Sequence, residues 1–125
     1  MKPYILVVDD DPQIFEVLSG ILHEEGFDVL WARNPEEFQL KTLSGRKPDL
    51  IMLDIALGNE NGPDVYKRLL IQGLDRGIPV IFISGLIQNH DSEPPVRAGR
   101  LYAMHGKPFE FDRLLSDIRS LTSMA

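Results

Sequence analysis

The sequence predicts a doubly wound α/β domain, and three observations support that fold class. Short apolar runs alternate with segments of helical periodicity, as in a parallel sheet whose right-handed crossovers place helices on both faces. Several of the apolar runs end in a polar residue, which is typical where ligands bind beyond the carboxyl ends of parallel strands. A length of 125 residues suits a single domain with one hydrophobic core.

Five apolar runs are predicted to be the strands of this sheet. The first is continuously apolar, as in a strand that is covered on both faces. The third and fourth have the same character and lead directly into Asp54 and Ser84, whereas the fifth is a weaker signal. In chain order the predicted strands are residues 4–8, 27–32, 50–53, 80–83 and 101–104.

The first two helices have recognisable start and stop signals. Asp11 and Pro12 predict an N-cap and a proline in the first helical position, so Asp11 is expected to serve as a helix cap. Gly26 is expected to end this helix. Residues 34–37, with the sequence NPEE, predict a capping box that begins the second helix, which should end near Gly45.

The later helices are less uniform. A third helix is expected from Pro63 to Ile71, and apolar residues at helical spacing mark a last one around residues 114–121. Between them, residues 86–99 should contain the fourth helix, but the pair of prolines at 94 and 95 removes backbone donors. Helix four is therefore expected to be short or irregular.

Composition narrows the classes of partner. The formal net charge is -6, which argues against attraction to nucleic acid or to an anionic membrane through this domain. The chain has no cysteine and hence no disulfide framework, and its first apolar run is too short for a signal peptide or a membrane span. We expect a cytoplasmic domain.

Polar residues follow four of the predicted strands and would converge if the strand order is 2-1-3-4-5. Asp9 and Asp10 follow the first strand, Asp54 the third, Ser84 the fourth and Lys107 the fifth. Three neighbouring carboxylates repel one another unless a cation lies between them, and Mg²⁺ is commonly held by carboxylates, water and phosphate oxygens. A hydroxyl and an ammonium group could bind the other phosphoryl oxygens. This set of groups suits phosphoryl transfer.

Taken in order, these motifs resemble the receiver (CheY-like) domain of bacterial two-component response regulators. The resemblance covers essentially the full chain and implies one receiver domain over residues 1–125. No output domain is expected within these residues, so the chain is either a single-domain regulator or the receiver of a longer one. It also implies a (βα)5 flavodoxin-like sheet of order 2-1-3-4-5 and a regulatory phosphoprotein of phosphorelay signal transduction that is not an enzyme. The matching segments are VVDDDP at 7–12, PDLIMLDIALGNENG at 48–62, PVIFISG at 79–85 and GKPF at 106–109.

The resemblance assigns a role to each residue at the acidic end of the sheet. Asp54 would accept the phosphoryl group from a histidine kinase or a histidine phosphotransfer protein. Mg²⁺, or Mn²⁺ in its place, would be bound by Asp9, Asp10 and Asp54 together with the main-chain carbonyl of Ala56. The phosphorylated domain would then switch a surface that binds a downstream protein partner. The chain would be a monomer or a weak dimer that depends on phosphorylation.

The switch residues match the family only in part. Ser84 matches the hydroxyl that follows the phosphoryl group, and Lys107 matches the lysine that pairs with it. The Lys107–Pro108 peptide bond would be cis. The family places an aromatic residue three positions before the lysine, whereas this chain has Met104 there and Tyr102 two residues earlier. Either Met104 or Tyr102 would act as the switch partner on strand five.

Two other functions remain open at this point. A degenerate receiver could act as a binding module that is never phosphorylated. A phosphatase of the haloacid-dehalogenase type could use Asp9 as the nucleophile and Asp11 as the acid/base. Against the phosphatase, Gln13 replaces the residue that its motif prefers, and the chain is short for that fold.

Overall fold

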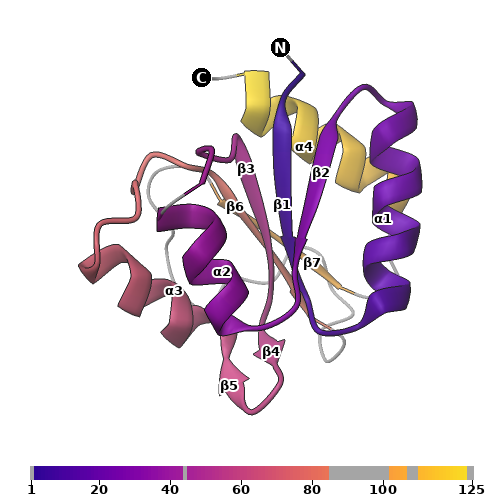
Figure 1. Ribbon diagram of the computed structural model, residues 1–125. Coiled ribbons are helices and arrows are strands. Elements are labelled where there is room, and N and C mark those ends of the chain that lie inside the picture. Colours follow the sequence, from indigo (N-terminus) through magenta and orange to yellow (C-terminus); the bar gives the residue numbers. More distant parts are fainter. Residues whose placement is uncertain (1, 44, 85–101, 107–109, 124–125) are drawn as a thin grey trace.

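A five-stranded parallel sheet forms the centre of the molecule (Figure 1). The computed structural model describes residues 2–43, 45–84, 102–106 and 110–123, with residues 102–106 and 123 described through the backbone alone. The strand order β2-β1-β3-β6-β7 is the predicted order 2-1-3-4-5, and every neighbouring pair is parallel. The strands are β1 (Tyr4–Val8), β2 (Asp28–Ala32), β3 (Leu50–Asp54), β6 (Val80–Ser84) and β7 (Tyr102–Gly106).

Helices cover both faces of the sheet, so the doubly wound prediction is confirmed. Helices α2 (Pro35–Leu43) and α3 (Gly62–Ile71) lie on one face, and α1 (Pro12–Glu24) and α4 (Phe111–Ser123) lie on the other (Figure 1). The predicted irregular helix within residues 86–99 lies outside the described residues.

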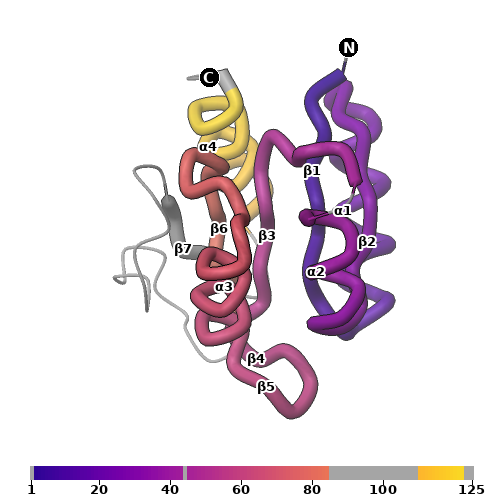
Figure 2. The backbone as a smooth tube through the Cα atoms, turned by 60° about the vertical axis from the view of Figure 1, so that its left-hand side comes forward, coloured from indigo at the N-terminus to yellow at the C-terminus, as the bar shows by residue number. Residues whose placement is uncertain are grey.

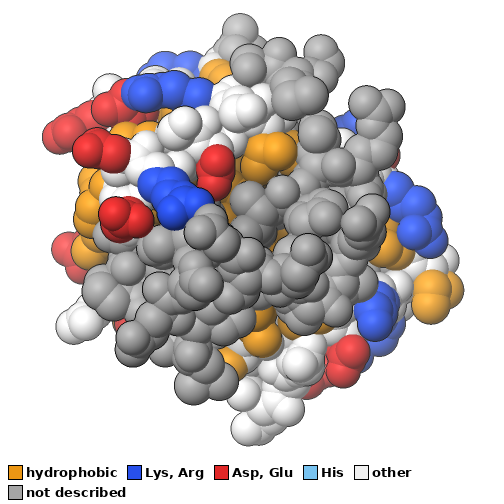
Figure 3. All heavy atoms as spheres, turned by 180° about the vertical axis from the view of Figure 1, so that it is seen from behind, with side chains coloured by type: hydrophobic (Ala, Val, Ile, Leu, Met, Phe, Trp, Pro, Cys, Tyr) orange, Lys and Arg blue, Asp and Glu red, His pale blue; other side chains and the backbone are white. Residues whose placement is uncertain are grey.

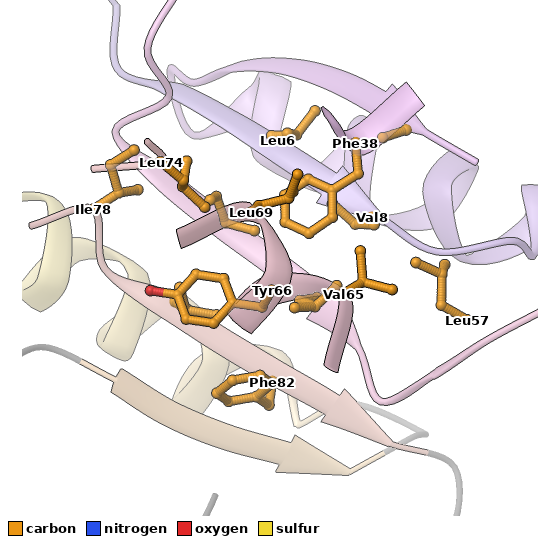
Figure 4. Close-up of a cluster of buried hydrophobic side chains, with 14 of the residues drawn as sticks. Leu6, Val8, Phe38, Leu57, Val65, Tyr66, Leu69, Leu74, Ile78 and Phe82 are labelled. Carbon is orange, nitrogen blue, oxygen red and sulfur yellow. The ribbon is translucent and has the colours of Figure 1, made fainter. Parts of the chain in front are cut away.

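Two apolar clusters fill the two sides of the sheet, because successive side chains of a strand point to opposite faces. Along β1, Leu6 and Val8 belong to one cluster, whereas Ile5 and Val7 belong to the other. Figure 4 shows the first cluster, which includes Phe38 of α2. The continuous burial of β1, β3 and β6 explains why these strands read as uninterrupted apolar runs.

A small hairpin follows β3, between the predicted third strand and the predicted third helix. Strands β4 (Ala56–Leu57) and β5 (Glu60–Asn61) pair in antiparallel fashion across the two residues 58 and 59. Gly58 has a φ of +63° and no other residue of this turn has a positive φ, which matches a type II′ hairpin turn with glycine at its first central position. Two strands of two residues each are too short to leave a pattern in the sequence.

The predicted helix signals act largely as expected. The Asp11 side chain accepts a hydrogen bond from the Gln13 backbone N–H and caps α1, and Gly26 follows that helix with a φ of +92°. In the capping box of α2, the Asn34 side chain accepts from the Glu37 N–H at 2.8 Å. The Glu37 carboxylate accepts not from the cap residue but from the Arg33 N–H, one residue earlier.

Strand β2 is an outer strand of the sheet and is held along its free side by α2. The Lys41 ammonium donates a hydrogen bond to the Trp31 main-chain carbonyl. At the next outward-facing backbone position, the Arg33 N–H donates to Glu37 at 2.9 Å. Leu30, which precedes Trp31 on β2, is 49% exposed to solvent.

The surface carries charges of both signs. Figure 3 shows acidic and basic side chains interspersed on the described part of one face, and the ion pairs include Arg33–Glu37, Lys47–Asp75 and Arg68–Glu60. Among the described residues, no helix is both long and apolar enough to cross a membrane.

Candidate functional site

The site lies at the carboxyl ends of the central strands. Strands β1 and β3 are adjacent and in register from Ile5 opposite Leu50 to Val8 opposite Leu53, so the residues that follow them emerge side by side. Figure 2 shows the β4–β5 hairpin projecting at this same end of the sheet, opposite the end where the two chain termini lie. The topology therefore gathers the residues after β1, β3 and β6 at one edge, as the sequence predicted.

Three carboxylates meet at this edge. One oxygen from each of Asp9, Asp10 and Asp54 can be chosen so that all three lie within 4.8 Å of one another. Asp9 is 0% and Asp54 is 4% exposed, whereas Asp10 is exposed to solvent. Two buried acids and one exposed acid thus form a cluster of concentrated negative charge.

Backbone hydrogen bonds orient the two buried carboxylates. The Asp9 carboxylate accepts from the Asp11 N–H at 2.9 Å, and the Asp54 carboxylate accepts from the Ala56 N–H at 3.2 Å. The Asp11 side chain instead accepts from the Gln13 N–H and caps α1. The three consecutive aspartates therefore divide into two members of the acidic cluster and one helix cap.

A glycine lies against the main chain of Asp54. The Gly62 N–H donates to the Ile55 carbonyl at 2.7 Å. A Cβ atom at Gly62 would lie 3.1 Å from the Asp54 carbonyl carbon, 3.4 Å from the Ile55 Cα, and closer still to the Asp54 carbonyl oxygen. No side chain fits there, so α3 begins in direct contact with the strand end that presents Asp54. This contact of Gly62 was not predicted from the sequence.

Trp31 of β2 contacts the other side of the cluster and was also missed. Its indole N–H donates to the Asp9 main-chain carbonyl at 2.7 Å. Its role could have been suspected from the chemistry of the side chain, because a buried tryptophan N–H usually needs a hydrogen-bond acceptor and the loop after β1 offers backbone carbonyls.

The remaining predicted site residues divide into described and undescribed ones. Ser84 ends β6, is 3% exposed and lies one residue beyond Ile83, the partner of Asp54 in the sheet register. Met104 and Tyr102 lie on β7, opposite Phe82 and Val80, but their side chains are outside the described part of the structure. Lys107 and the Lys107–Pro108 peptide bond also lie outside the described residues.

The donor set fits a hard divalent cation. Carboxylate and main-chain carbonyl oxygens are the ligands that Mg²⁺ takes in proteins, usually with several waters retained. Burial of Asp9 and Asp54 within 4.8 Å of Asp10 makes their mutual repulsion costly, and a bound cation would relieve it. Asp10, the exposed member of the cluster, is in contact with solvent.

Sequence comparisons point to one family. A model of the response regulator receiver domain matches residues 5–119. The chain is 33% identical over 121 residues to the DNA-binding response regulator MtrA of Mycolicibacterium smegmatis, covering 96% of this chain and 50% of MtrA. It is 34% identical over 119 residues to the DNA-binding dual master transcriptional regulator RpaA of Synechocystis sp., covering 95% of this chain and 48% of RpaA. The chain thus spans about half the length of these relatives.

Solved structures give the same result. The response regulator protein TrrA of Thermotoga maritima, determined in complex with Mg²⁺ and BeF, superposes with a TM-score of 0.76 at 33% identity and covers 97% of this chain and 99% of that one. The receiver domain of the Francisella response regulator 1452 superposes with a TM-score of 0.78 at 26% identity, covering 98% of both chains.

Proposed function

Since the chain belongs to the response regulator receiver domains of two-component signalling, we propose that it accepts a phosphoryl group on Asp54 in a Mg²⁺-dependent reaction. The donor would be a phosphohistidine of a histidine kinase or of a histidine phosphotransfer protein. The observation that carries this proposal is the cluster of Asp9, Asp10 and Asp54 at the carboxyl ends of adjacent strands. The Mg²⁺ and BeF in the TrrA structure support it by analogy.

Asp54 would be the nucleophile. One carboxylate oxygen attacks the phosphorus of phosphohistidine, the P–N bond breaks, and the imidazole leaves while Asp54 becomes an acyl phosphate. The hydrogen bond from Ala56 N–H holds the Asp54 carboxylate in place, which favours an in-line approach. Asp54 is 4% exposed, so little of its side chain is in contact with solvent.

Asp9 and Asp10 would hold the cation together with Asp54 and the Ala56 carbonyl. When bound, Mg²⁺ neutralises negative charge on the carboxylates and on the phosphoryl oxygens. Asp9 is buried and oriented by the Asp11 N–H, so it supplies a fixed ligand. Asp10 is exposed and completes the site from the solvent side.

Ser84 and Lys107 would bind the remaining phosphoryl oxygens. Ser84 ends the strand next to β3, which supports a position near the phosphoryl group on Asp54. The proposal for Lys107 rests on its place directly after β7. Phosphorylation would then alter a surface that is recognised by a downstream protein partner, with Met104 or Tyr102 as the residue of β7 that responds.

Chemical phosphorylation tests this proposal. The protein is incubated with acetyl phosphate and Mg²⁺, the acyl phosphate is trapped by borohydride reduction, and the modified peptide is mapped by mass spectrometry. One phosphoryl group on Asp54 is expected, with none in Asp54→Asn or in the presence of EDTA. Label on Asp9 would instead indicate the phosphatase, and intact Mg²⁺ binding without any label would indicate a binding module.

A further inference from the structure

The single tryptophan of the chain lies where it can control the acidic loop between β1 and α1. The loop comprises residues 9–11. The Trp31 indole N–H donates to the Asp9 carbonyl at 2.7 Å, and the neighbouring Ala32 carbonyl accepts from the Asp9 N–H at 3.2 Å. Both backbone polar groups of Asp9 are thus bound to the end of β2, one of them through a side chain.

The indole ring is itself fixed by its neighbours. It stacks on Phe15 of α1, with 5.0 Å between ring centroids and 8° between planes. The Arg33 guanidinium carbon lies 5.5 Å from the ring centroid, and Arg33 is paired with Glu37 at 2.8 Å. The Lys41 ammonium binds the Trp31 carbonyl. The ring therefore connects the first residue of the acidic loop to the first turns of the helix after it.

This connection determines where Asp10 lies. The Asp9 carbonyl and the Asp10 nitrogen belong to one planar peptide unit, so a hydrogen bond that fixes the carbonyl also fixes the orientation of the backbone at Asp10. Asp10 is the exposed member of the cluster, in a segment without regular structure. If a loop becomes ordered only when the ligand binds, the loss of conformational entropy lowers the affinity. A loop that is already ordered before binding does not have this cost.

We propose that Trp31 is a positioning residue of the cation site, and that its indole N–H holds the loop of residues 9–11 so that Asp9 and Asp10 face Asp54. The inference rests on the proposed function, because it concerns the same site. Trp31 contacts the loop backbone and not the cation, and it acts through Asp9.

Removal of the indole N–H tests the inference. Trp31→Phe keeps an aromatic ring beside Phe15 and deletes the hydrogen-bond donor. The Mg²⁺ dissociation constant of this variant, measured by calorimetry, should be about three- to tenfold higher, which is the change expected from the loss of one hydrogen bond. Leu30→Ala, at the exposed neighbouring position, should leave the constant unchanged. Thermal unfolding in EDTA shows whether each variant is folded without metal.

Replacement of Trp31 by amino-acid analogues separates the donor from the shape of the ring. Benzothienylalanine, in which sulfur replaces the N–H, should reproduce the weakened binding. 5-Fluorotryptophan, which retains the N–H, should bind Mg²⁺ as the unmodified protein does. If the unmodified protein binds Mg²⁺ and the Phe and benzothienylalanine proteins bind it equally well, the inference is wrong while the proposed function stands. If the unmodified protein binds no Mg²⁺, the proposed function itself fails.

Discussion

The contact between Gly62 and the Asp54 main chain leads to a sharp prediction about Gly62→Ala. The added Cβ would lie 3.1 Å from the Asp54 carbonyl carbon and nearer still to its oxygen, and these are backbone atoms that cannot rotate away. Either β3 or the start of α3 must move. Overpacking of a buried site costs about 1–3 kcal/mol, and we expect the upper end, about 3 kcal/mol, because no side chain is available to yield.

A matched control is available in Gly20. It lies within α1, is exposed, and has no atom within 4 Å of the position that a Cβ would take. Gly20→Ala should therefore stabilise the protein by about 1 kcal/mol, the difference in helix propensity between the two residues. The same substitution, glycine to alanine, is therefore expected to lower the free energy of unfolding at Gly62 and to raise it at Gly20.

Urea unfolding at fixed Mg²⁺ measures both differences, and thermal unfolding should show a melting temperature roughly 10 °C lower for Gly62→Ala. Because the displaced backbone carries Asp54, labelling by acetyl phosphate should also slow in Gly62→Ala and not in Gly20→Ala. A Gly62→Ala protein as stable as the wild type, with normal labelling, would refute the argument that close backbone contact at Gly62 positions Asp54.

Three further predictions concern other parts of the structure. Mg²⁺ at millimolar concentration should raise the melting temperature of the wild type; Asp10→Asn should abolish most of that rise, whereas Asp11→Asn, which keeps a good helix cap, should retain it. Tyr66 is 0% exposed and its hydroxyl has no hydrogen-bond partner in the described structure, so Tyr66→Phe should be stabilising by about 1 kcal/mol in urea unfolding, and a loss of stability would reveal a partner. The Arg33 guanidinium and backbone N–H lower the pKa of Glu37 to about 2. The stabilisation from this pair is thus present above pH 4.5 and is lost as the pH falls through about 2, so Glu37→Gln should be modestly less stable than wild type at pH 7 and should approach it below pH 2.

Tyr66 combines an aromatic contact in the core with a buried hydroxyl group. Its ring meets Phe82 of β6 edge to face, with centroids 6.5 Å apart, inside the cluster drawn in Figure 4. Phenylalanine at this position preserves the ring pair and removes only the polar atom, which makes the variant a clean test of the cost of burying an unpaired hydroxyl.

The strands could be predicted because burial on both faces leaves a simple pattern, whereas their order was implied by the resemblance to receiver domains. Residues 50–54 and 80–84 are buried throughout, so each reads as an apolar run that ends in a polar side chain. The positions of Asp9 and Asp54 at one edge then follow from parallel topology alone. The role of Asp11 as a cap was also predictable, because the proline after it marks the helix start.

Features that depend on contacts between distant segments were not predictable in the same way. Gly62 directly precedes the predicted third helix, and nothing nearby in the sequence reveals that its backbone packs on Asp54. Trp31 appeared to be one more apolar residue of a strand, although its N–H binds Asp9, 22 residues earlier in the chain. The second strand also begins at Asp28, one residue later than expected, because pairing and not hydrophobicity sets its end.

The contacts from α2 to the free side of β2 affect how this protein behaves when it is crowded. An outer strand with open backbone groups is a template on which another chain can add a strand, which is a common route to domain swapping and aggregation. Here the Lys41 ammonium donates to the Trp31 carbonyl, and the Glu37 carboxylate accepts from the Arg33 N–H. Two consecutive outward-facing backbone positions of β2 are therefore already hydrogen-bonded. A second molecule would have to displace both charged side chains before it could extend the sheet at this end.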